Sequence, residues 1–250
     1  MEKHLYDSGL IGNCSFIAHI QKNTNISWLC MPRFDSDFLF GGILDKEKGG
    51  EFTILPESGE YESSQSYLEN TNILETVIQG NEGCYKVTDF APRFKNYDRY
   101  FRPLMLIRKI EPISGFPRIR IKCQPVSERG TKKLKGTPGS NHIQFLNSDQ
   151  EVRLTTNASL SHIIDEKSFV LHRPVYLVFT YGRPLEAPIE STSERFLQAT
   201  TEYWHRWVKS TSIYNFHQRL VLRSALILKI HQYEDTGAII AASTTSLPES

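Results

Sequence analysis

The residues best suited to chemistry lie in one short stretch, W-L-C-M-P-R-F-D-S-D-F-L-F, at positions 28–40. Pro32 ends a strand-like run, and Arg33, Phe34 and Asp35 follow it before apolar sequence resumes. Carboxylates and a guanidinium can hydrogen-bond the hydroxyl groups of a sugar, while aromatic rings can cover its C–H faces. This combination on one tight bend is therefore suited to binding a polyol.

A structural explanation of the same stretch is the one that its residue types favour. Arg33 could pair with Asp35 or Asp37 and fix the loop, while Phe34 fills the core, because charged turns are common and usually solvated. The residue types alone leave both interpretations standing.

A hydrolase acting by itself would need a second carboxyl group. The candidate acids are Asp35, Asp37 and Asp89, but nothing else in the chain marks a partner acid. Asp89 ends an alternating strand shortly before Pro92, so we expect it to cap that turn.

No metal or cofactor is predicted. The four cysteines are far apart and form no C-x-x-C pair, which weakens zinc and thioredoxin-like interpretations. They are Cys14, Cys30, Cys84 and Cys123. Because each lies in a strand-like run, we expect buried free thiols. His19 lies among apolar neighbours and is expected to be a structural histidine.

Charge and hydropathy exclude several classes of partner. Lys and Arg number 29 against 28 Asp and Glu, which gives a net charge of +1 over 250 residues. This balance argues against a dedicated nucleic-acid or anionic-membrane surface. The N-terminus lacks the apolar segment of a signal peptide, and no stretch approaches the ~18 apolar residues of a membrane span. We therefore expect a cytoplasmic protein without nucleic-acid or membrane partners.

The stretch must be positioned by β structure. Alternating apolar residues bounded by turn signals predict more than ten strands up to residue 181, which favours a large antiparallel β-sandwich. The predicted strand-like runs are 10–20, 26–30, 51–55, 65–69, 72–79, 84–90, 104–110, 118–122, 142–146, 152–155 and 175–181.

The pattern changes to helical spacing after Pro188. A first helix is predicted to start at Thr192–Glu194, and a second to run over 215–234. The second helix is apolar on more than one face and therefore expects neighbours on several sides. The chain supplies few of them, so we expect an exposed apolar patch there and a polypeptide that stops at the start of a second domain.

Several ordered strings of the sequence resemble the N-terminal domain of glycoside hydrolase family 15, which includes glucoamylases, glucodextranases and trehalases. The most distinctive are I-S-W-L-C-M-P-R-F-D-S near the start and T-T-S-L-P-E at the end. The matching segments are 9–13, 26–36, 67–74, 87–92 and 233–249. The segment between about 111 and 181 is less distinctive.

The resemblance implies a mainly β fold. It would be a large antiparallel super-β-sandwich at 1–190, a linker helix at 191–212, and at 213–250 the first helix and loop of a truncated (α/α)6 barrel. The implied activity is inverting hydrolysis of α-glucosidic bonds, in which one carboxylic acid protonates the leaving oxygen and a second carboxylate activates water. In the family both glutamates belong to the barrel, so no catalytic residue is carried over to this chain.

The implied function is therefore a non-catalytic module that supports and docks its own barrel. Trp28, Arg33, Phe34 and Asp35 would bind substrate or brace that interface, and α-glucosides are the expected ligands. The alternatives are a stand-alone carbohydrate-binding sandwich and an independent hydrolase.

Overall fold

The computed structural model describes residues 7–57, 59–146 and 151–244. The fold is mainly β with antiparallel sheets, and its two long helices follow the last strand, as the sequence predicts. Most of the T-T-S-L-P-E string, at 245–249, lies outside the described residues.

One large sheet forms the first layer. Its eight strands are all antiparallel, and they alternate inward apolar and outward polar residues best at the hairpin of residues 74–90. In spatial order they are β15 (Gly136–Pro138), β16 (His142–Leu146), β17 (Glu151–Thr156), β19 (Val175–Tyr181), β11 (Met105–Gly115), β8 (Gly83–Phe90), β7 (Leu74–Gln79) and β6 (Glu62–Tyr67).

Two smaller sheets form the opposing layer. The four-stranded sheet contains β1 (Ser8–Gly12), β2 (Ile17–Gln21), β3 (Ile26–Cys30) and β4 (Phe38–Phe40). The three-stranded sheet contains β18 (Phe169–Val170), β12 (Arg118–Gln124) and β5 (Glu51–Pro56).

The layers share one apolar core. The rings of Phe40, Phe52 and Phe179 come from three different sheets, with centroids 5.5–5.9 Å apart. Such aromatic contacts are favourable beyond the burial of their surface, so they join the sheets into one sandwich.

Two short hairpins, β9 (Phe94–Asn96) with β10 (Arg99–Phe101) and β13 (Val126–Ser127) with β14 (Lys132–Lys133), extend from the sandwich. A 3-10 turn, η1 (Glu128–Gly130), and a short helix, α1 (Leu160–Ile164), complete its loops.

Asp89 does not cap a turn. It lies inside β8, paired in register with Arg108 of β11, and both side chains are 0% exposed. Arg108 Nε donates to Asp89 Oδ1 at 2.7 Å, and the same guanidinium donates to the backbone oxygen of Phe52 at 2.8 Å. The expectation of a capping role was wrong because the neighbouring strand supplies a buried cation that the sequence pattern does not reveal.

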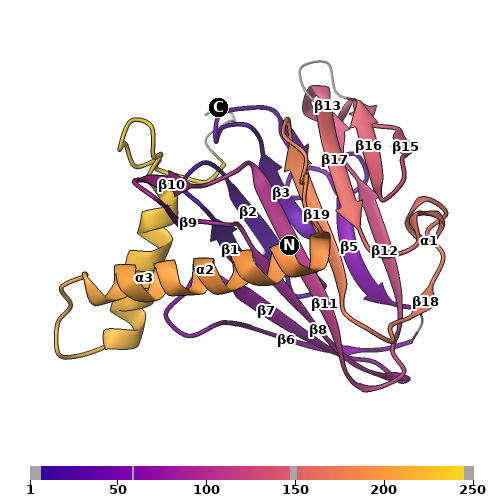
Figure 1. The fold of residues 1–250 in the computed structure, drawn as a ribbon, viewed down its shortest axis with the longest axis horizontal. Helices are drawn as coiled ribbons and strands as arrows, with labels where there is room; N and C mark the ends of the chain where they lie inside the picture. The colour runs from indigo at the N-terminus through magenta and orange to yellow at the C-terminus, as the bar shows by residue number, and fades with distance from the viewer. Residues whose placement is uncertain (1–6, 58, 147–150, 245–250) are drawn as a thin grey trace, which may run out of the picture.

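The two long helices pack on different parts of the sandwich. Helix α2 (Ile189–Lys209) lies across the strands of the large sheet, and α3 (Gln218–His231) lies at the end of the molecule away from β15 and β16 (Figure 1). Phe196 of α2 packs on Phe90, Ile107 and Val178 of the sheet. The amphipathic pattern that predicts α2 is thus satisfied by the sheet face beneath it.

Candidate functional site

The loop at 31–37 faces the last part of the described chain, residues 232–244. The contact begins at Trp28 of β3, which is fully buried and donates its indole Nε1–H to the backbone oxygen of Ser243 at 2.9 Å. His19 on the neighbouring strand β2 contacts the Ser243 hydroxyl through Nε2 at 2.6 Å. Two side chains of the four-stranded sheet therefore hold one residue of the C-terminal segment.

Phe34 connects the loop to the helices. Its ring is buried, and it meets the ring of Tyr233 edge-on with centroids 5.8 Å apart. It belongs to one apolar cluster with Trp204 of α2 and Leu226 and Ile230 of α3. Phe34 is thus a core residue at the junction of the sandwich, both helices and the C-terminal segment.

Arg33 and Asp35 form the exposed rim of the same loop. The guanidinium donates twice to the carboxylate, from Nε at 2.9 Å and from Nη2 at 2.8 Å, and both side chains are more than half exposed. The pair borders a pocket of about 270 Å³, whose remaining lining is Phe34, Tyr233, Thr236, Ala238 and Ile240. Asp35 is the single acid in that described lining, so the pocket lacks the second carboxylate that glycoside hydrolysis requires.

Of the four residues that the sequence singles out, three line this pocket. Arg33, Phe34 and Asp35 come together there, whereas Trp28 packs in a separate cluster with Cys30, Phe38 and Val126. Trp28 contacts the C-terminal segment through its indole nitrogen.

Two arginines that the sequence did not single out form ion pairs with the C-terminal segment, residues 232–244. Arg93 is 1% exposed at its side chain and pairs with Glu234 at 2.8 Å, while Arg102 pairs with Asp235. Arg93 also donates to the backbone oxygen of Asn13 at 3.0 Å. Both arginines lie in irregular, proline-containing sequence, where no periodicity indicates which side chains point inward.

Helix α3 is buried on one side only. Leu226 and Ile230 are 1% and 0% exposed, whereas Leu220 and Leu228 are 68% and 57% exposed. The two exposed leucines are eight residues apart, which places them about 80° apart around the axis, within the width of one apolar stripe. Tyr214 and Phe216, just before α3, are also largely exposed. We call Tyr214, Phe216, Leu220 and Leu228 the α3 outer face.

Polar contacts fix α3 against the loop that precedes β7. Asn72 donates from Nδ2 to the backbone oxygen of Leu226 at 3.0 Å, and Arg223 donates to the backbone oxygen of Thr71 at 2.7 Å. Arg223 also contacts the Asn72 amide oxygen and lies over the ring of Tyr67 at 3.8 Å. The inner side of the helix is thus bound firmly, in contrast to its outer face.

Burial shifts the pKa of titratable groups near the C-terminal segment. Burial lowers the pKa of His19 to about 4, and the nearby His231 acts in the same direction. Burial also raises the pKa of the Cys14 thiol, so this cysteine stays protonated and donates to the backbone oxygen of Lys229. His19 is therefore a neutral structural group at neutral pH.

The part of the chain described here shows no group of three or more His, Cys, Asp and Glu side chains that could hold a metal. Within the same residues, the helices are too short or too polar to cross a bilayer.

The chain matches one protein-family model. Residues 4–169 match the model described as trehalase-like, N-terminal. The match includes the sandwich up to β18 and stops before both long helices.

Similarity to whole proteins extends further along the chain. A trehalase of Thermoplasma acidophilum is 33% identical over 92% of this chain, and one of Thermoplasma volcanium is 31% identical over 96%. Trehalase 1 of Sulfolobus acidocaldarius is 30% identical over 96%. The chain spans only about 40% of the length of each of these relatives.

Proposed function

Because this chain belongs to the family of trehalase-like N-terminal domains, we propose that it is the non-catalytic β-sandwich module of an inverting, exo-acting α-glucoside hydrolase. The relatives named trehalases support a glycosidase as the parent activity and trehalose as its substrate class. The motif strings in the sequence support glycoside hydrolase family 15. The proposed units are the sandwich at 1–190, the linker helix at 191–212 and the start of the catalytic domain at 213–250.

The observation that carries this proposal is the α3 outer face. A helix in water normally turns its apolar stripe toward a core, and exposed apolar patches mark interaction surfaces. Here a second stripe, with Leu220 and Leu228, remains exposed after the inner side has packed. Helix α3 contains no acidic residue, and the exposed Arg219 next to Leu220 adds a positive charge beside this apolar face.

The proposed occupant of the face is a helix of the catalytic (α/α)6 barrel. Most of each relative's length lies outside the matched region, which supports a further domain of that size. A barrel of paired helices would supply the ridges that pack against an apolar helix stripe. Catalysis would use two carboxyl groups of the barrel, set apart to admit a water molecule.

In this proposal the sandwich has no chemical role and holds the start of the catalytic domain in place. Trp28 holds Ser243 and Phe34 holds Tyr233, so these two residues brace the chain where it leaves the sandwich. Arg33 and Asp35 would line the domain interface or the entrance to the substrate pocket. Asp89 takes no part in hydrolysis because it is fully buried and paired with Arg108.

The first test is the coding sequence that follows Ser250. We expect the reading frame to continue into a W-x-R-D segment and to encode the barrel. An immediate stop codon would contradict the proposal.

The second test is association. The downstream polypeptide, supplied as a separate chain, is expected to bind this one, and Leu220→Glu or Leu228→Glu should each weaken binding. Burying a leucine contributes about 1.5–3 kcal/mol, so the expected loss in Kd is roughly 10- to 100-fold per substitution. Isothermal titration calorimetry measures it.

The matched control is Leu146→Glu. Leu146 is a leucine of similar exposure, 66%, on β16 at the opposite end of the molecule (Figure 1). It should leave the affinity unchanged. Equal losses for the control and the α3 variants would contradict docking on α3.

A stand-alone carbohydrate-binding sandwich is the second candidate. The pocket beside Arg33 and Asp35 favours it, because a polar rim next to the Phe34 and Tyr233 rings suits a sugar. NMR titration with maltose or trehalose tests it. Saturable shifts confined to residues 31–37 would favour binding there, and silence of this loop would favour bracing.

A further inference from the structure

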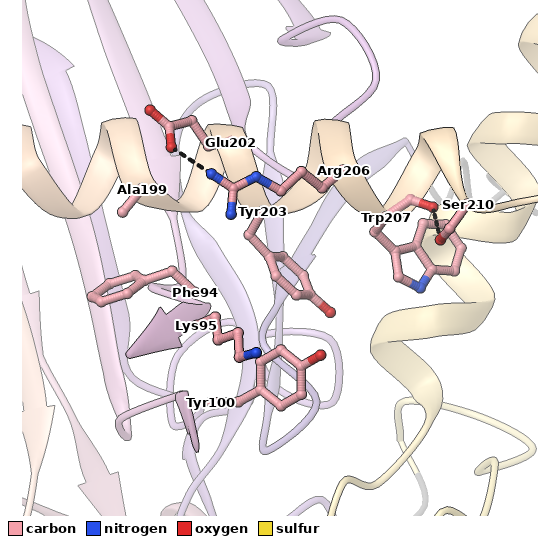
Figure 2. A pocket seen from close by; sticks show the side chains of 9 residues that line it. All are labelled: Phe94, Lys95, Tyr100, Ala199, Glu202, Tyr203, Arg206, Trp207 and Ser210. Carbon is pink, nitrogen blue, oxygen red and sulfur yellow. Dashed lines mark hydrogen bonds and ion pairs between the residues drawn. The ribbon is translucent and has the colours of Figure 1, made fainter. Parts of the chain in front are cut away.

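A second pocket, away from the 31–37 loop, lies between α2 and the β9–β10 hairpin. It encloses about 310 Å³ and is lined by Phe94, Lys95, Tyr100, Ala199, Glu202, Tyr203, Arg206, Trp207 and Ser210. Figure 2 shows the Tyr203 ring beside that of Tyr100 and the Lys95 amine, with Trp207 further along α2 and the paired Glu202 and Arg206 at the helix itself. A volume of this size is at the lower end for small-molecule sites and suits one sugar ring.

The buried Arg93 holds the two tyrosine rings of this pocket in place. Arg93 is buried, and its guanidinium carbon is 5.0 Å from the centroid of the Tyr100 ring and 4.9 Å from that of Tyr203. The two rings meet edge-on at 5.9 Å. Because Arg93 is itself bound to Asn13 and Glu234, the rings are ordered before any ligand arrives, which reduces the entropic cost of binding.

The rim of the pocket is polar and carries both signs of charge. Glu202 and Arg206 pair at 3.2 Å across one turn of α2, with side chains 50% and 75% exposed. Such a surface pair contributes little to stability, so its donors and acceptors can be shared with a ligand. Lys95 adds three further donors.

This arrangement matches the two-sided surface of a pyranose. The C–H face of a sugar ring is apolar and can stack on aromatic rings, while its equatorial hydroxyls need donors and acceptors at the edge. The rim supplies both donors and an acceptor, as a neutral sugar requires, and its two cations outnumber its one carboxylate, so an anion is the competing ligand.

We propose that the pocket formed by Tyr100, Tyr203 and Trp207 binds one pyranose ring of an α-glucoside. It is a binding subsite without chemistry. The choice of α-glucosides as ligands rests on the proposed function, while the preference for a neutral sugar ring rests on the pocket itself.

The test is an NMR titration of this chain with maltose, trehalose and glucose. We expect saturable shifts at residues 94–100 and 199–210, with dissociation constants in the millimolar range. Tyr100→Ala should weaken binding at least about fivefold, because it removes one stacking face. The half-buried Trp207 gives a second readout through its fluorescence, since Trp28 and Trp204 are buried.

The matched control is Tyr97→Ala. Tyr97 belongs to the turn of the same hairpin and is 91% exposed, but it does not line the pocket. The Tyr97→Ala variant should bind sugar as the unchanged chain does. Tyr97→Ala and Tyr100→Ala should both keep the amide spectrum of the folded chain.

Three results would overturn the proposal. They are the absence of saturable shifts, equal weakening by Tyr97→Ala and Tyr100→Ala, and saturation by inorganic phosphate but not by any sugar. None of these bears on docking at α3, which the association experiment measures separately.

Discussion

At the scale of single residues, two of the Arg–Asp pairs in the described part of the chain have opposite consequences. Arg33–Asp35 lies in water, whereas Arg108–Asp89 is completely buried. Burial raises the pKa of Asp89, and the adjacent Arg108 opposes this shift and stabilises the carboxylate. We therefore expect stability to depend on the buried pair far more than on the exposed one.

Substitution of one acid in each pair should separate these roles. Asp89→Asn leaves Arg108 buried without its counter-charge and is expected to lower the free energy of unfolding by roughly 3–5 kcal/mol. Asp35→Asn, the exposed control, should cost less than about 1 kcal/mol. Urea denaturation measures both, and similar losses would show that the buried pair has no special role.

At the scale of secondary-structure elements, α3 has one side that stabilises the chain and one that does not. Leu226→Ala removes a buried side chain beneath the helix and should cost about 2–5 kcal/mol. Leu228→Ala, two residues further on the outer face, should change stability by no more than about 0.5 kcal/mol. Thermal or urea unfolding tests this, and a large loss at Leu228 would mean that the outer face is already packed.

The sequence predicts most of these elements because their periodicity is strong. The hairpin of β7 and β8 and the strand β19 are confirmed almost residue for residue. The run 10–20 was wrong as a single strand, since it divides into β1 and β2 at a turn where Cys14 has φ of 69°. The strands β4, β9, β10 and β18 have only two or three residues and are too short to show a period.

The bounds of the helices were also predicted only approximately. The second one was expected over 215–234 but begins at Gln218, after His217 with φ of 51°, and ends at His231. Its exposed apolar patch is confirmed by Leu220 and Leu228. The candidate site was only partly predictable, because Arg93, Tyr100 and Tyr203 meet through long-range packing that leaves no local pattern.

At the scale of the whole molecule, we expect the stability of the fold to depend on pH through His19, which contacts Ser243 of the C-terminal segment. The pKa of His19 is lowered to about 4 in the folded chain, below the ordinary value near 6.5. The unfolded chain therefore takes up this proton first as the pH falls. Stability is fully present above about pH 6.5 and is lost as the pH falls from there toward 4.

The expected loss from His19 alone is roughly 2 kcal/mol by pH 5. Unfolding measured between pH 7 and pH 5 should show it as the difference between the unchanged chain and His19→Gln, which keeps a polar group near Ser243 but does not titrate. Parallel pH profiles for the two proteins would contradict this assignment.

The bond from Asn72 to the backbone oxygen of Leu226 has a consequence for motion. It meets α3 in the middle of the helix, and together with Arg223 it fixes both axial position and rotation. Consecutive residues of a helix differ by 1.5 Å in height and 100° in angle, so a slip of even one residue would break both contacts. Any sliding of α3 along the sandwich would therefore have to break both hydrogen bonds, whereas a motion of the helix together with the loop before β7 would keep them.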